Sequence, residues 1–291
     1  MTRIALAACF LALLAPAAPA LEATGLDAIT TPGRPVRVSA KFEHRGWAFF
    51  RLDVRRAGAN VSVLGQTTRA VTDGDGVAYA TVTPTAPGVH PIDAWLDREP
   101  GTRARGRLFV FDPARPVVVV DVDGTISDLP DWRVPFDGDR APAFAGSVQV
   151  LTELARTHHV VYLTARDDTL DAKTRAFLAR HGFPDGPVVF NDQGLWTRAE
   201  RLRIVPRNHG RAKRAQLEAL RARGVRLALG IGNAETDGEA YEGVGLPSYL
   251  NTRERGAGSS IRFTRWDTEL RPRLVADGHL PRSRGLVGSI P

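Results

Sequence analysis

Asp121 and Asp123 are the residues of this sequence whose type and spacing most clearly indicate chemistry. They follow four valines at 117–120, a run typical of a buried strand, and Gly124 lets the chain turn sharply after them. Two neighbouring carboxylates repel each other, and burial disfavours the charged form of both. A cation or an anionic substrate would remove this conflict. The alternative interpretation is a solvated turn.

Polar residues also follow two later strand-like runs, in "YLTAR" and in "GIGNAETD". In a doubly wound sheet, the carboxyl ends of neighbouring strands meet in one crevice, so we expect these side chains to converge. Carboxylate and amide oxygens suit Mg²⁺, a hard cation that takes one or two carboxylates and leaves room for phosphate. The expected metal ligands are Asp121, Asp123, Asn233 and Asp237.

The elements that must position these residues begin after "DPARP" at 112–116, where strand-like and helix-like runs alternate. Strands are expected over 117–123, 159–166, 186–192 and 225–233, and helices over 147–157, 168–182 and 210–224. The helix over 168–182 has Asp168 or Thr169 as its expected N-cap and Gly182 as its C-cap. The alternation predicts an α/β fold, a Rossmann-like doubly wound parallel sheet.

The chain before this point has a different rhythm, because short apolar and polar runs alternate from 35 to 111 without a helical period. Strands are expected over 36–42, 48–54, 77–82 and 107–112, which predicts an all-β sandwich. The stretch 70–84 resembles the turn-and-strand pattern of bacterial immunoglobulin-like modules. Asp73 and Asp75 could ligate calcium, but the rest of a calcium loop is missing, and a β-turn is favoured.

The first twenty residues are typical of a cleaved export signal: Arg3, an apolar run over 4–14, and Ala18-Pro19-Ala20. We therefore expect a periplasmic or secreted protein. The only cysteine, Cys9, lies in this segment, so a mature chain has no thiol. The net charge is +7, and lysines are scarce. The expected organisation is a signal peptide at 1–20, an Ig-like domain at 25–112, the α/β domain at 113–268 and an extension at 269–291. The tail from Arg271 is expected to be solvated.

"DVDGT" after an apolar strand resembles motif I of the haloacid dehalogenase-like phosphohydrolases, and further motifs follow in order. Thr164 fits the hydroxyl of motif II, and Asn233 and Asp237 fit the acidic pair of motif IV. Motif III requires a lysine. Lys213, at the start of the helix before the "VRLALGIGN" strand, fits better than Lys173, which lies within the helix after motif II.

The resemblance narrows to the lipin-type phosphatidate phosphatase domain and the related C-terminal domain of phosphatidylinositol-transfer proteins. It rests on "DVDGTIS", "YLTAR", "HGFPDGPVVF" and "GIGNAETDGEAYEGVGLP", and spans roughly 116–265. That family dephosphorylates phosphatidate using Mg²⁺, or binds phosphatidate where catalysis has been lost. This chain keeps both motif I aspartates, which favours an enzyme. It departs from the family at Ala234, where lipins have arginine.

The resemblance implies phosphomonoester hydrolysis in two steps. Asp121 attacks phosphorus and forms an aspartyl-phosphate, while Asp123 serves as acid and then as base. Thr164 and Lys213 complete the expected catalytic set and also bind the phosphoryl group. The expected substrate-binding residues are Thr164, Arg166, Lys213, Gly124 and Thr125. Arg166 has alternatives, because it could also pair with Asp167 or Asp168.

Only about forty residues separate Asp123 from Thr164, too few for a large cap domain, so an open site and a bulky substrate are expected. The loop 127–136 places Leu129, Trp132, Val134 and Phe136 beside the site. They could dip into a membrane interface, or pack on the sheet as an ordinary flap. An anionic phospholipid or membrane surface is the expected partner and nucleic acid is not. The alternatives are a non-catalytic phosphatidate-binding module and a phosphatase for soluble monoesters or nucleic-acid ends.

Overall fold

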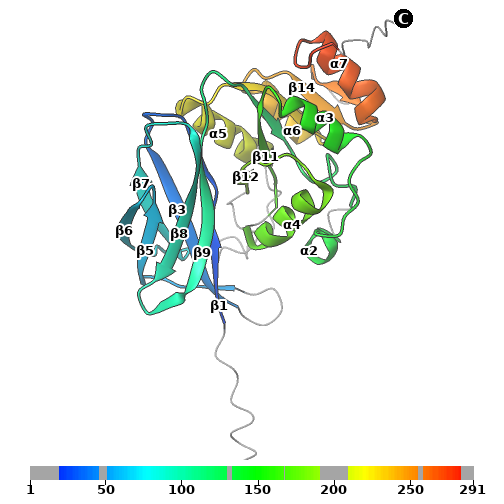
Figure 1. Cartoon of the computed structure of the whole chain (residues 1–291). Coiled ribbons are helices and arrows are strands. Elements are labelled where there is room, and N and C mark those ends of the chain that lie inside the picture. Colours follow the sequence, from blue (N-terminus) through cyan, green and yellow to red (C-terminus); the bar gives the residue numbers. More distant parts are fainter. Residues whose placement is uncertain are drawn as a thin grey trace, which may run out of the picture.

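The computed structural model describes residues 20–45, 51–129, 133–166, 168–190, 209–254 and 258–282. The expectations for residues 1–19, Trp132, Asp167 and residues 283–291 lie outside these ranges, as do residues 48–50 and 191–192 of two expected strands. Figure 1 shows a β-rich part, coloured blue to cyan, beside an α/β part, coloured green to red. Within the described ranges, no helix is both long and apolar enough to cross a membrane.

The β-rich part is built from two sheets. One contains β1 (Leu21–Gly25), β3 (Val36–Arg45), β4 (Arg51–Asp53) and β7 (Val77–Val82), and the other contains β2 (Ala28–Thr30), β5 (Gly58–Val63), β6 (Gln66–Val71), β8 (Gly88–Leu96) and β9 (Glu99–Val110). Alternate residues point inward, so Val38, Phe42 and Val61 are fully buried between the sheets. This arrangement confirms the predicted sandwich.

The strand predictions hold best where apolar and polar residues alternate strictly. The strand at 77–82 is β7 without change, and the one at 36–42 extends to Arg45. The run at 107–112 overlaps the end of β9, which begins earlier than expected, at Glu99. Asp73 Oδ1 accepts hydrogen bonds from the backbone N–H groups of Asp75 and Val77, both at 2.9 Å. Asp73 therefore orders a turn, as the favoured interpretation predicts.

The α/β part is organised around one parallel sheet. Its strands are β10 (Val117–Val120), β11 (His159–Leu163), β12 (Val188–Val189), β13 (Leu227–Gly232), β14 (Ser248–Asn251) and β15 (Ile261–Phe263). The strand order is β12-β11-β10-β13-β14-β15, and every neighbouring pair is parallel. From β10 the chain adds β11 and β12 on one side, and then β13, β14 and β15 on the other side. The order therefore reverses between β10 and β13, where doubly wound sheets bind their ligands.

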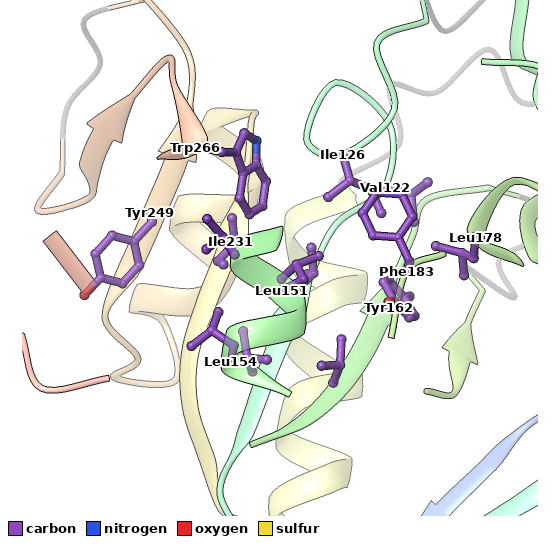
Figure 2. Packing of buried hydrophobic residues seen from close by; sticks show 14 of the residues in the cluster. Val122, Ile126, Leu151, Leu154, Tyr162, Leu178, Phe183, Ile231, Tyr249 and Trp266 are labelled. Carbon is purple, nitrogen blue, oxygen red and sulfur yellow. The ribbon is translucent and has the colours of Figure 1, made fainter. Parts of the chain in front are cut away.

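Helices cover both faces of this sheet. They are α2 (Val134–Asp137), α3 (Ser147–Leu154), α4 (Asp171–His181), α5 (His209–Ala222), α6 (Glu235–Glu242) and α7 (Arg271–Ala276), with the shorter turns η2 (Asp168–Leu170) and η3 (Trp266–Leu270). Val118 and Val120 of β10 point into the cluster formed with α3 and α4, part of which Figure 2 shows. Val117 and Val119 point to the opposite face, where α5 and α6 pack. A strand buried on both faces explains the four consecutive valines.

Two local predictions in this part are wrong. The expected N-cap at Asp168 or Thr169 is not found, because those residues form the 3₁₀ turn η2 and Leu170 is the N-cap of α4. The C-cap prediction is confirmed, since Gly182 has a φ of 74°, a conformation that glycine adopts without a steric cost. The strand expected over 186–192 is shorter in its described part, because within residues 186–190 β12 comprises only Val188–Val189.

The expected solvated tail is also wrong over its first part. Helix α7 places Leu274 in the apolar cluster of α3 and α4, where it is fully buried, and Leu280 beyond the helix is also buried. Leu270 and Leu274 are four residues apart and therefore lie on one helix face. The arginines and prolines around them gave this segment its polar composition. Leu274 and Leu280 thus anchor this segment in the core of the α/β part.

Candidate active site

Lys213 joins two aspartates at the carboxyl edge of the parallel sheet. Its Nζ lies 2.7 Å from Asp121 Oδ1 and 2.5 Å from Asp237 Oδ1. Asp121 follows β10, Asp237 lies in the first turn of α6, and Lys213 lies in the first half of α5. All three side chains are almost completely buried. The predicted motif III lysine is therefore in contact with the predicted nucleophile, whereas Lys173 donates to the backbone oxygen of Phe136.

The charges of this buried group do not balance, because two carboxylates share one ammonium. Burial raises the pKa of Asp121 to about 7, although the ammonium of Lys213 opposes the rise and the carboxylate of Asp237 adds to it. Burial alone would lower the pKa of Lys213, but attraction to Asp121 and Asp237 outweighs it and raises that pKa. The site thus holds surplus negative charge that a further cation would neutralise.

Thr125 and Asn233 complete this network. Thr125 Oγ1 donates to Asp121 Oδ2 at 2.9 Å, and Asn233 Oδ1 lies 3.4 Å from the same hydroxyl oxygen. Gly124 has a φ of 70°, and a Cβ at this position would overlap the Asn233 side-chain amide. Glycine is therefore required both for the turn after β10 and for the close approach of Asn233.

Asp237 is fixed by the start of its own helix. Its Oδ2 accepts hydrogen bonds from the backbone N–H of Asn233 at 3.1 Å and from that of Ala234 at 3.2 Å. Its other oxygen meets Lys213, so both oxygens have defined partners. The segment between β13 and α6 thereby holds Asn233 and Asp237 in a single orientation.

Asp123 belongs to a second, adjoining network. Its two carboxylate oxygens accept hydrogen bonds from Arg166, Oδ2 from Nε at 2.9 Å and Oδ1 from Nη2 at 2.7 Å. Of the partners considered for Arg166 from the sequence, Asp168 instead lies 3.3 Å from Lys41 of β3, and Asp167 lies outside the described ranges. The guanidinium thus binds the aspartate predicted as acid and base. A role of Arg166 in substrate binding stays a prediction.

Thr164 lies at the end of β11, next to β10 in the sheet. Its hydroxyl oxygen accepts the backbone N–H of Arg166 at 3.1 Å, and the residue is fully buried. The hydroxyl proton remains available for another acceptor. The substrate roles predicted for Thr164, Gly124, Thr125 and Lys213 remain predictions, although all four residues lie in or beside the two networks.

Sequence reasoning missed two residues that support the site. Asn251, at the end of β14, donates from Nδ2 to the backbone oxygens of Gly124 at 3.3 Å and of Thr125 at 3.2 Å. Its position at a strand end was the signal that could have identified it. Thr174 of α4 accepts a hydrogen bond from Arg166 Nη1 at 3.0 Å. It is one polar residue among several in a helix, and nothing in the sequence distinguished it.

The four predicted metal ligands do not form one carboxylate cluster. Within the described ranges, no group of three or more His, Cys, Asp or Glu side chains could by itself hold a metal ion. Asp121, Asn233 and Asp237 belong to one hydrogen-bonded network, and Asp123 directs its carboxylate to Arg166. The donor set at the first network consists of hard oxygens and carries uncompensated negative charge, so these residues fit a divalent cation.

The apolar residues of the loop 127–136, expected beside the site, are partly buried and partly exposed. Leu129 and Val134 are buried in the cluster of α3 and α4, so the flap interpretation holds for them. Phe136 in α2 is 59% exposed. Of the loop residues named from the sequence that the structure describes, Phe136 is the one exposed at the surface.

The strand order and the carboxylates at the strand ends define a doubly wound α/β domain with a polar site at the carboxyl edge of its parallel sheet. Residues 118–250 match the family model described as PITM 1-3, LNS2 domain. This segment, somewhat under half of the chain, is thus similar to LNS2 domains, in agreement with the resemblance found in the sequence. No curated protein matches the chain.

Several solved structures resemble parts of the chain. A D,D-heptose 1,7-bisphosphate phosphatase from B. bronchiseptica, complexed with magnesium and phosphate, is 18% identical, with a TM-score of 0.43, over 56% of this chain and 99% of its own. A HAD-superfamily hydrolase from Geobacter sulfurreducens is 17% identical, with a TM-score of 0.36, over 56% and 96%. A CARDB domain from Pyrococcus furiosus is 17% identical, with a TM-score of 0.23, over 33% and 90%. None of these likenesses informs the chemistry of this chain.

Proposed function

We propose that this protein is a Mg²⁺-dependent phosphomonoester hydrolase that acts through an aspartyl-phosphate on Asp121, with phosphatidate or a related phospholipid as substrate. The observation that carries the proposal is the contact of Lys213 Nζ with Asp121 Oδ1 at 2.7 Å. It places a fixed cation against the carboxylate that must approach an anionic phosphate. The LNS2 match over residues 118–250 supports the same conclusion.

The proposed reaction assigns one step to each motif I aspartate. An oxygen of Asp121 bonds to phosphorus while the ester P–O bond breaks, and Asp123 gives a proton to the leaving oxygen. Asp123 then takes a proton from water as the water oxygen attacks phosphorus and the Asp121–phosphorus bond breaks. The products are an alcohol and inorganic phosphate. Asp123 suits both steps because it follows Asp121 by two residues and is more exposed, at 18% of its side chain.

Asp121 and Asn233 are the side chains that would hold Mg²⁺, with Asp237 beside them and the backbone oxygen of Asp123 as a further ligand. When bound, the ion supplies positive charge that screens the phosphate from these carboxylates. Lys213 donates to Oδ1 of Asp121, and Thr125 donates to Oδ2. These contacts orient the nucleophile before substrate arrives.

A phospholipid is favoured over a small metabolite by the size of the insert between β10 and β11. The described part of the insert contains only α2, α3 and short turns. Phe136 in α2 is exposed, and an aromatic side chain at such a position can enter a bilayer interface. The same protein with residues 1–20 removed carries a net charge of +6, which favours anionic surfaces. We further propose that it acts outside the cytoplasm, after removal of the export signal.

Phosphate release from vesicles containing phosphatidate tests the proposed reaction. We expect release with Mg²⁺ and none after chelation with EDTA, and we expect Asp121→Asn to abolish it. An acid quench during turnover of ³²P-labelled phosphatidate should trap label on the wild-type chain and not on Asp121→Asn. Retained vesicle binding with no phosphate release would instead indicate a phosphatidate-binding module.

The lipid assignment has its own test. Rates on phosphatidate vesicles are compared with rates on a short-chain monoester and on a 3′-phosphorylated oligonucleotide, and the vesicles should give the highest rate. Phe136→Ser should lower the vesicle rate and leave the rate on the short-chain monoester unchanged. Val71→Ser is the matched control, because Val71 is 64% exposed on β6 of the sandwich. If vesicles are the poorest substrate, the protein is a phosphatase for soluble monoesters or nucleic-acid ends.

A further inference from the structure

The carboxylate of Asp123 is held on both oxygens by one buried arginine. Arg166 approaches with its Nε and Nη2 atoms at 2.9 and 2.7 Å, the two-point geometry that guanidinium and carboxylate groups form best. The Arg166 side chain is only 1% exposed, whereas that of Asp123 is 18% exposed. The arginine therefore lies behind the aspartate, on the protein side, and Asp123 is the member of the pair that faces solvent.

Arg166 is itself fixed from two further directions. Its Nη1 donates to Thr174 Oγ1 at 3.0 Å, and Thr174, which is fully buried, donates in turn to the backbone oxygen of Leu170 at 2.9 Å. The backbone N–H of Arg166 donates to Thr164 Oγ1 at 3.1 Å. Each nitrogen of the guanidinium thus has a protein partner, and the side chain is anchored to both β11 and α4.

We infer that Arg166 is a positioning residue that aims the carboxyl group of Asp123 at the leaving-group oxygen, and that it does not bind the substrate. The inference rests on the proposed function. A carboxyl group carried on single bonds can rotate. The two-point contact prevents that rotation and leaves the solvent-facing side of Asp123 free to give and take a proton.

This role predicts a dependence on the leaving group. When the leaving oxygen belongs to an alkyl alcohol, the bond to phosphorus breaks slowly unless the oxygen is protonated, so the reaction needs a well-placed acid. When the leaving group is 4-nitrophenolate, the negative charge is already stabilised and the acid matters little. Loss of an arginine that binds the phosphoryl group would slow both substrates alike, because the same phosphoryl group is transferred.

The experiment measures kcat and KM for the full chain on dioctanoyl phosphatidate and on 4-nitrophenyl phosphate. Because Asp123 also serves as base in the second step, which both substrates share, the comparison uses kcat/KM, which reports the first step alone. Arg166→Gln should lower kcat/KM on phosphatidate by about 100-fold, the scale of a lost acid, and kcat/KM on 4-nitrophenyl phosphate by less than about tenfold. Asp123→Asn should show the same split. The double variant should be no slower than Asp123→Asn, because both changes remove the same function. Arg180→Gln, which changes an exposed arginine of α4, should match the wild type.

Two further variants separate positioning from folding. Arg166→Lys keeps the charge without the two-point geometry and should show the same split between substrates. Thr174→Val keeps the shape of the side chain, removes the partner of Nη1, and should show a smaller split in the same direction. A merely structural role would lower the melting temperature and slow both substrates equally. Arg166→Lys and Thr174→Val therefore test the inference even if Arg166→Gln does not fold.

The outcomes distinguish this inference from the proposed function. Equal losses on both substrates with a raised KM would assign Arg166 to the substrate and overturn the inference alone. Losses that multiply in the Arg166→Gln/Asp123→Asn double variant would also overturn it alone. If the wild type releases no phosphate from either substrate, or if Asp121→Asn changes nothing, the proposed function fails and this inference fails with it.

Discussion

Asp27 of the sandwich and Arg175 of α4 form a buried ion pair between the two parts of the chain, with Asp27 Oδ2 at 2.9 Å from Arg175 Nη1. The Asp27 side chain is fully buried. It also accepts hydrogen bonds from the backbone N–H groups of Arg107 and Val188, both at 3.1 Å. One carboxylate therefore ties the sandwich to both α4 and β12. A residue placed this way couples the stability of the two parts.

Asp27→Ala should destabilise the whole chain. Arg175 keeps its pair with Asp171, but its Nη1 and two backbone N–H groups lose their acceptor. Each buried donor left unsatisfied costs about 1 kcal/mol, so the loss should be about 3 kcal/mol. The sandwich residues Ile29, Phe109 and Phe111 also share an apolar cluster with Val117 and Val119 of β10, so both parts should unfold in one transition. Urea denaturation followed by tryptophan fluorescence and circular dichroism measures both effects.

The control for Asp27 is Asp185→Ala, which breaks a more exposed pair between the same two parts, Asp185 with Arg107. Exposed pairs contribute below about 1 kcal/mol, so this variant should lie close to the wild type. Equal effects of Asp27→Ala and Asp185→Ala would contradict the coupling assigned to Asp27. Two separate unfolding transitions would contradict it as well.

A pH effect on stability is expected from His159, at the start of β11. Its ring stacks on Phe111 with centroids 4.1 Å apart, and burial, followed by repulsion from Arg115, lowers the pKa of His159 to about 4. The folded state therefore binds fewer protons than the unfolded state between that pH and the ordinary histidine pKa of 6.5. The stabilisation is present above pH 6.5 and is lost as the pH falls toward 4.

His159→Phe keeps the stacked ring and removes the titration, so the free energy of unfolding should fall less steeply between pH 6.5 and pH 4. Since the ring is only partly buried, the difference should be about 1 kcal/mol. Urea denaturation at several pH values measures it. His158 and His279, whose pKa values burial also lowers, keep part of the slope in the variant. Parallel curves for the wild type and His159→Phe would rule out this role.

Lys213→Met should reduce phosphate release by at least about 100-fold, because the fixed charge next to the nucleophile is lost. Lys173→Met is the matched control, since Lys173 is the other lysine of this half of the chain and donates to the backbone oxygen of Phe136 in α2. Phosphate release and thermal melting are measured on both. If Lys173→Met caused the larger loss of rate at unchanged melting temperature, the choice of Lys213 as the motif III lysine would be wrong.

The positions of the proposed catalytic groups could be predicted from the sequence, because their place directly after apolar strand-like runs can be seen in it. The four valines before Asp121 and the apolar run before Asn233 mark strands buried on both faces, and parallel strands bring their ends together. The lysine could be chosen because only Lys173 and Lys213 occur in this half of the chain. Apolar runs and the small number of lysines can both be read directly from the sequence.

Contacts that depend on loop conformation or on packing between the two parts could not be predicted in this way. The sequence left several partners open for Arg166. In the structure Arg166 pairs with Asp123, which the turn after β10 brings to it. Asp27 resembles any solvated aspartate until the sandwich packs against α4. Leu129 and Val134 face the core while Phe136 faces solvent, because the direction of the short helix α2 determines which residues are covered.

Gly124→Ala should weaken the proposed Mg²⁺ binding. The added Cβ overlaps the side-chain amide of Asn233, so Asn233 must turn away from Thr125 and Asp121. The Mg²⁺ concentration for half-maximal phosphate release should rise about tenfold, the effect of a displaced neighbour of a metal site. Isothermal titration with Mg²⁺ in the absence of substrate should show the same shift, and it does not depend on turnover.

Gly182→Ala separates this effect from backbone strain. Gly182 has a φ of 74°, close to the 70° of Gly124, but a Cβ there meets no atom within 4 Å. Both variants should lose about 1 kcal/mol of stability from the left-handed conformation, since alanine pays that cost at either position. Only Gly124→Ala should change Mg²⁺ affinity. The same Mg²⁺ affinity in both variants would mean that Asn233 does not contribute to the metal site.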